Sequence, residues 1–136
     1  LKPGRLDETE LEIMKTHAEK GYEILRGSKS KMLDLAALIA WTHHEKIDGS
    51  GYPRGLKGED IPIQGRIVAV ADVFDALTSE RPYKQAWEIE RAIQWLREGE
   101  GQHFDPVCVE AFLARRDDFL EIKFSFQDAV LSNAHL

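Results

Sequence analysis

The sequence predicts an all-α fold, a bundle of about five principal helices. Apolar residues recur at spacings of three and four positions, which places them together on one face of a helix. Capping residues stand where these patterns begin, and glycines or prolines stand near their ends. The predicted helices cover 6–27, 32–44, 62–79 and 88–98, and a fifth begins at Phe104-Asp105-Pro106.

Three of the predicted helices have recognisable starts. Asp7 is followed three residues later by Glu10, which is the spacing of a capping box. Pro62 stands in the first turn of the third helix, where its missing N–H costs nothing. Asp105 followed by Pro106 combines an N-cap with a proline at the first helical position.

Length and composition indicate one globular domain. The 136 residues can bury roughly two thirds of their unfolded surface. We assign residues 1–120 to this domain and 121–136 to a weakly patterned C-terminal tail. The net charge of -6 argues against binding to a nucleic acid polymer or an anionic membrane.

The cysteine count and the lengths of the apolar runs bear on where the protein is located. Its single cysteine, Cys108, excludes an internal disulfide, so we expect a cytoplasmic protein. No apolar run approaches the roughly 20 residues of a membrane-spanning helix.

A pair of histidines forms the most distinctive feature of the sequence. His43 and His44 end an apolar helix and are followed at once by a glycine-rich segment, residues 45–61. Imidazoles that leave a helix into such a loop are typical of a metal site with an open side for substrate. The structural alternative makes one of the two a hydrogen-bonded core residue.

Other ionisable residues occupy apolar segments. His17 lies on the apolar stripe of the first helix, either as a core histidine bonded to a carbonyl or as a ligand. Asp72 is embedded in an apolar helix, where a buried carboxylate would need a cation, a metal or a helix-end hydrogen bond. Arg81 and Lys84 flank a rigid proline, so they are either solvated cations or a phosphate clamp.

These residues occur in motifs that closely resemble the HD-GYP family. The motif HHExxDGxGYPxGLxGxxIP runs from His43 to Pro62, and DVFDALTSxRPYK runs from Asp72 to Lys84. The shorter GxHFDP lies between Gly101 and Pro106. The similarity extends from the first residue to about Phe112. The family consists of all-helical bacterial signal-transduction proteins of the HD superfamily, phosphodiesterases of cyclic di-GMP that hold two or three iron or manganese ions.

The resemblance implies roles for individual residues. The metal ligands would be His17, His43, His44 and Asp72. Arg81 and Lys84 would contact substrate phosphate, and Asp75 would orient a ligand from outside the coordination sphere. The family's GYP loop corresponds here to Asp48, Gly49, Gly51, Tyr52 and Pro53; it lines the site and in some members binds diguanylate cyclase domains.

The sequence departs from the family in one respect. No His-Asp pair occurs in the 136 residues, whereas the family's namesake dyad, an earlier histidine and a following lysine precede the matching segment. Residues 1–5 resemble a linker, so we expect an N-terminally truncated domain, with a degenerate family member as the alternative.

Several expectations follow from the missing dyad. The remaining ligands would form half a site, with partial metal occupancy and no useful turnover of cyclic di-GMP. The competing function is a non-catalytic module that binds partner signalling domains. A phosphohydrolase of other nucleotides is disfavoured by the intact GYP loop. Apolar helix faces left uncovered by absent helices would favour a homodimer.

Overall fold

The computed structural model describes residues 7–133, except for the side chains of residues 11 and 127–133, and the part that it describes is all-α. The helices are α1 (Glu8–Leu25), α2 (Lys31–Thr42), the 3₁₀ turn η1 (Gly58–Asp60), α3 (Ile63–Thr78), α4 (Ile89–Glu98), α5 (Pro106–Ala114) and α6 (Arg116–Asn133). The predicted helical fold class is confirmed.

Two of the three predicted helix starts are formed as expected, whereas Pro62 is the N-cap of α3, which begins one residue later at Ile63. At α1 the Asp7 carboxylate accepts from the Glu10 N–H at 2.8 Å, and the Glu10 carboxylate accepts from the Asp7 N–H at 3.0 Å. The Asp105 side chain accepts from the Val107 N–H at 2.9 Å, and Pro106 is the first residue of α5. These caps satisfy N–H groups that have no partner inside their helices.

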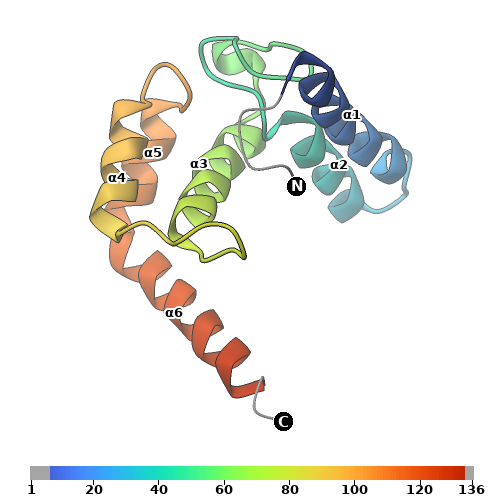
Figure 1. The fold of residues 1–136 in the computed structure, drawn as a ribbon. Coiled ribbons are helices and arrows are strands. Elements are labelled where there is room, and N and C mark those ends of the chain that lie inside the picture. Colours follow the sequence, from blue (N-terminus) through green and yellow to red (C-terminus); the bar gives the residue numbers. More distant parts are fainter. Residues whose placement is uncertain (1–6, 134–136) are drawn as a thin grey trace.

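Helix α6 occupies residues where the sequence predicted a weakly patterned tail. Phe119 and Leu120, near its start, pack against the core. Farther along, Ile122, Phe124 and Phe126 are 58%, 51% and 69% exposed, and the helix extends away from the rest of the chain (Figure 1). The periodicity was uninformative here because the apolar side chains described for α6, up to Phe126, do not form one buried stripe.

The other helices are arranged around α3, which lies between two helix pairs (Figure 1). The α1–α2 hairpin packs on one side of α3 through α2, and α4 and α5 pack on the other side. Two glycines permit close approach. A Cβ at Gly65 would lie 2.3 Å from Thr42 Oγ1, and a Cβ at Gly21 would lie 3.2 Å from the Ala40 Cβ. A larger residue at position 65 would therefore push α3 away from the end of α2.

The main hydrophobic core is formed by α3, α4, α5 and the loop before α5. Its buried members are Val70, Phe74, Ala92, Ile93, Leu96, Phe104, Cys108 and Val109. Burial raises the pKa of the Cys108 thiol, which packs in this core as a small apolar residue. None of the described helices has both the length and the apolarity needed to span a bilayer.

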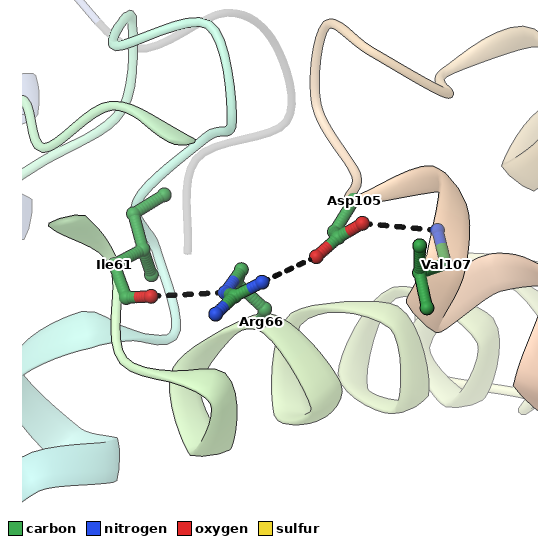
Figure 2. Close-up of polar contacts among 4 residues, drawn as sticks. All are labelled: Ile61, Arg66, Asp105 and Val107. Carbon is green, nitrogen blue, oxygen red and sulfur yellow. Dashed lines mark hydrogen bonds and ion pairs between the residues drawn. The ribbon is translucent and has the colours of Figure 1, made fainter. Parts of the chain in front are cut away.

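An almost buried ion pair joins this core to the loop that precedes α3 (Figure 2). The Arg66 guanidinium donates to the Asp105 carboxylate at 2.6 Å and to the Ile61 carbonyl at 2.9 Å. The Arg66 and Asp105 side chains are 17% and 10% exposed. Burial raises the pKa of Asp105, but the bonds from Arg66 and from the Val107 N–H outweigh it and hold the pKa below its ordinary value.

Apolar side chains are exposed on α2 and α3, as expected from the sequence. Met32, Leu33 and Leu35 of α2 are 78%, 41% and 42% exposed, and Ile63 and Ile67 of α3 are 44% and 53% exposed. An open apolar groove of about 450 Å³ runs between α3, α5 and α6. Surfaces of this kind favour self-association, and the homodimer stays a prediction.

Replacing Arg66 with Leu should lower the free energy of unfolding by about 3 kcal/mol, because it leaves a nearly buried carboxylate without its cation. Urea unfolding followed by circular dichroism measures the change. Arg116→Leu is the control, since Arg116 pairs with Glu90 in an exposed position and should alter stability little. Equal effects of the two substitutions would contradict the importance of the buried pair.

Candidate metal centre

Three histidines, one from the middle of α1 and two from the C-terminal end of α2, lie close together. His17 is on α1, His43 is the C-cap of α2 and His44 follows it. One nitrogen from each ring lies within 4.8 Å of the other two. Nε2 of His17 and Nε2 of His44 are 3.0 Å apart. The structure thus brings together three of the four predicted ligands.

The other ring nitrogens of two histidines face backbone carbonyls within their own helices. His17 Nδ1 contacts the Met14 carbonyl, and His43 Nδ1 lies 2.8 Å from the Ile39 carbonyl. When Nδ1–H donates to a carbonyl, the lone pair of a neutral imidazole is on Nε2. His17 therefore satisfies both interpretations of the sequence, since one nitrogen is bonded to a carbonyl and the other points into the cluster.

The pKa of His44 is strongly shifted by its surroundings. Its pKa is lowered from 6.5 to about 4, first by burial and then by the neighbouring His43 and His17, while Asp72 acts in the opposite direction. A neutral His44 at pH 7 can offer a lone pair to a cation. The chemistry of this donor set, three imidazoles with converging nitrogens, fits a divalent transition metal.

The GYP loop lies against this cluster. The Tyr52 ring stacks on the His44 ring with centroids 4.9 Å apart and an interplanar angle of 23°. The Tyr52 N–H also donates to the His44 carbonyl at 3.2 Å. Burial, and after it the charge of Asp72, raises the pKa of Tyr52. The tyrosine therefore covers one side of His44 with an aromatic face.

Another loop residue, Gly51, allows this placement. A Cβ at Gly51 would lie 2.3 Å from the Lys46 nitrogen and 2.6 Å from Glu45 backbone atoms, so only glycine fits there. The Tyr52–Pro53 peptide bond is cis.

Sequence reasoning missed Glu45, which is 2% exposed and accepts from the Arg54 and Leu56 N–H groups at 2.8 and 3.0 Å. Its position directly after the histidine pair was the available signal.

Asp48 lies in a turn of the loop that is hydrogen-bonded to the segment before α5. The Asp48 carboxylate accepts from the Ser50 N–H and hydroxyl at 2.8 and 2.6 Å, and Gly49 has a φ of 87°. The Asp48 N–H donates to the Gln102 carbonyl, and the Ile47 N–H donates to the His103 carbonyl. The hydrogen bonds of the Asp48 carboxylate are therefore those of a turn.

Asp72 differs from the expectation of a buried carboxylate. It is exposed on α3, because no described element covers that face of the helix. Its charge acts on both His44 and Tyr52, so it lies near the cluster, and its role as a ligand stays a prediction. The Asp75 carboxylate accepts from the Ser79 hydroxyl at 2.9 Å at the end of α3.

Arg81 and Lys84 are exposed in the turn that follows α3. Their backbones exchange hydrogen bonds at 3.0 and 2.9 Å, and Lys84 Nζ donates to the Ala76 carbonyl at 3.1 Å. Lys84 Nζ also lies 5.6 Å from the centre of the Trp87 ring. These contacts are all local, so the predicted contact with substrate phosphate stays a prediction.

Comparison with known proteins identifies the family. A profile described as HD domain matches residues 1–108. The cyclic di-GMP phosphodiesterase response regulator RpfG of Xanthomonas campestris is 53% identical over 129 residues, which cover 95% of this chain and 34% of that protein. The 3′3′-cGAMP-specific phosphodiesterase 2 of Vibrio cholerae is 51% identical over 127 residues, covering 93% of this chain and 24% of that protein.

A solved structure of a phosphodiesterase is also similar to this chain. The crystal structure of V-cGAP3, a cyclic GMP-AMP specific phosphodiesterase of Vibrio cholerae, matches with a TM-score of 0.61 and 32% identity over 80% of this chain and 25% of that one. The chain belongs to the HD domain family. Within it, the motifs and the relatives identify a member of the HD-GYP family. The chain spans about a third or less of the length of these curated relatives.

Stability should fall on acidification from pH 6.5 to pH 4. The pKa of His103 is lowered to about 4, first by burial and then by Lys46, and that of His44 is also about 4. Between the two pH values the unfolded chain binds more protons than the folded chain, so the free energy of unfolding decreases as pH falls. We expect a loss on the order of 2 kcal/mol after allowance for solvent screening.

Urea unfolding at a series of pH values measures this dependence. His103→Gln should reduce the slope between pH 6.5 and pH 4, because one of the two groups no longer titrates. A slope unchanged by this substitution would show that other groups account for the acid sensitivity.

Proposed function

We propose that this chain forms a divalent metal site of a cyclic dinucleotide phosphodiesterase of bacterial signal transduction. The observation that carries the proposal is the convergence of nitrogens from His17, His43 and His44 within 4.8 Å. Asp72 would add a carboxylate oxygen from α3. Imidazole and carboxylate ligands together suit iron and manganese, the metals implied by the family resemblance.

The chain's own residues would hold and orient the substrate. A bound divalent metal would neutralise phosphodiester charge and act as a Lewis acid. Arg81 and Lys84 would supply cationic contacts to phosphate oxygens, Lys84 as a point charge. Asp75 would orient a ligand from outside the coordination sphere. With a net charge of -6, the chain depends on such local cations to attract an anionic ligand.

The proposed substrate is cyclic di-GMP. The names of two relatives assign cyclic di-GMP and 3′3′-cGAMP to those proteins. The two ligands share a ring of two phosphodiesters, which is the chemistry that paired cations and a metal would recognise.

A second candidate function is a non-catalytic module that binds a diguanylate cyclase domain through the GYP loop. The absence of a His-Asp pair from the 136 residues favours it. Asp48 and Ser50 of the loop are exposed, and they could contact a partner without changing the histidine cluster.

Replacing His44 with Ala should reduce metal content, because one of the three converging imidazoles is lost. We expect at least a tenfold loss of affinity for Fe²⁺ or Mn²⁺. Anaerobic reconstitution followed by elemental analysis measures the content. His103→Gln is the matched control outside the cluster. Metal content equal to that of the unsubstituted chain would refute His44 as a ligand.

Binding and hydrolysis of cyclic di-GMP should separate in this chain. The manganese-loaded chain should bind the dinucleotide, with about tenfold weaker binding in Lys84→Ala and further weakening by salt. Hydrolysis should be negligible, because the His-Asp pair is missing. Calorimetry and chromatographic product analysis measure the two.

Each result of this experiment has a consequence. Turnover by this chain would show that the pair is dispensable and establish an enzyme. Binding without turnover would agree with an incomplete catalytic site. No binding in the metal-loaded chain would refute the substrate proposal and favour the partner-binding module.

A further inference from the structure

We infer that Glu45 is a positioning residue, whose carboxylate holds the GYP loop so that the Tyr52 ring covers His44. The structural half of this inference is independent of metal or substrate. Its consequence for ligand binding rests on the proposed function, since His44 matters there as a metal ligand.

The environment of Glu45 is unusual for an acidic side chain. Glu45 is 2% exposed, and Arg66 and the other described cations form no ion pair with it. Its two oxygens instead accept from the backbone N–H groups of Arg54 and Leu56 at 2.8 and 3.0 Å. A buried carboxylate is tolerated only when such donors replace the water that it loses. The loop therefore supplies the partners that Glu45 requires.

The path of the loop shows why these bonds fix Tyr52. Gly51 lies directly against the Glu45 backbone, and the Tyr52 N–H donates to the His44 carbonyl. Pro53 has no N–H, and the residues on its C-terminal side donate to the Glu45 carboxylate. Tyr52 is thus attached before and after the proline to the residues of the 44–45 segment. These attachments hold the Tyr52 backbone beside His44, and the Tyr52 ring stacks on the His44 ring.

A separate contact of Arg54 provides a comparison. The Arg54 guanidinium carbon lies 3.6 Å from the centre of the Trp41 ring, and Trp41 stacks on Tyr22 with centroids 4.0 Å apart. This stack is made by the side chain of Arg54, whereas Glu45 binds its backbone. Arg54→Ala should therefore remove the stack and leave the bonds to Glu45 intact.

The position of Tyr52 restricts the direction from which a ligand can reach His44. Tyr52 covers one face of His44, so a ligand must approach the histidine cluster from another side. The same ring limits the rotation of His44 and keeps its nitrogen directed towards His17, 3.0 Å away. Residues that orient ligating imidazoles change metal affinity by about ten- to a hundredfold when they are removed.

The test compares variants in the metal-free chain by NMR. In the unsubstituted chain the His44 ring protons should show a nuclear Overhauser effect to the Tyr52 ring and an upfield ring-current shift. Tyr52→Leu supplies the reference shift without stacking. Glu45→Gln loses one of its two acceptor oxygens and should move the His44 shift towards that reference. Arg54→Ala and the exposed acidic control Glu59→Gln should leave it unchanged.

The second measurement is Ni²⁺ affinity by calorimetry. Glu45→Gln should bind about tenfold more weakly, and Glu59→Gln should bind as the unsubstituted chain does. Circular dichroism establishes that each variant is folded, and Glu45→Asp, which is too short to reach both N–H groups, replaces Glu45→Gln if that variant does not fold.

The outcomes are distinguishable. A Glu45→Gln chain that keeps both the Overhauser effect and the shift would overturn the inference, and so would lost stacking with unchanged Ni²⁺ affinity. If the unsubstituted chain binds no Ni²⁺, the metal site itself is refuted. The NMR comparison then still decides whether Glu45 positions Tyr52.

Discussion

The ion pair between Arg66 and Asp105 is the contact on which the arrangement of the helices depends. Arg66 lies in the first turn of α3 and reaches the end of the preceding loop at Ile61 and the start of α5 at Asp105 (Figure 2). A guanidinium can donate in two directions at once, which the compact ammonium of lysine cannot do in the same geometry. One side chain thereby relates the loop, α3 and α5. The desolvation cost is offset by the hydrogen bond within the pair and by one further hydrogen bond to each of its members.

The glycine-rich loop is fixed at both ends by packing against α3 and the core. At its start, buried Thr42 packs against Gly65 of α3, and at its end Ile61 is 2% exposed. Between these points, residues 45–61 form no regular structure apart from the short 3₁₀ turn η1. The path of the loop backbone therefore depends on hydrogen bonds such as those to Glu45. A long irregular loop that is ordered in this way is typical of a functional segment rather than a linker.

The sequence predicted what depends on local chemistry. Helix starts at Asp7 and Asp105 follow from side-chain caps, and the meeting of His17 with His44 was implied by the family motifs. Asp72 was expected to be buried because its neighbours in the sequence are apolar, yet composition does not say which face of a helix is covered. Glu45 was missed for the opposite reason. A charged loop residue is ordinarily solvated, and only the tertiary turn of the loop encloses it.

The charges around the histidine cluster favour the binding of a cation over that of an anion. Burial and mutual repulsion keep His44 neutral near pH 7, while the exposed carboxylate of Asp72 adds negative potential beside it. The net charge of -6 acts in the same direction at longer range. At the histidine cluster itself a phosphodiester would be repelled, whereas a divalent ion would be attracted. In the proposed site the ion would therefore bind first, and the dinucleotide would bind to a surface whose local charge the ion has reversed.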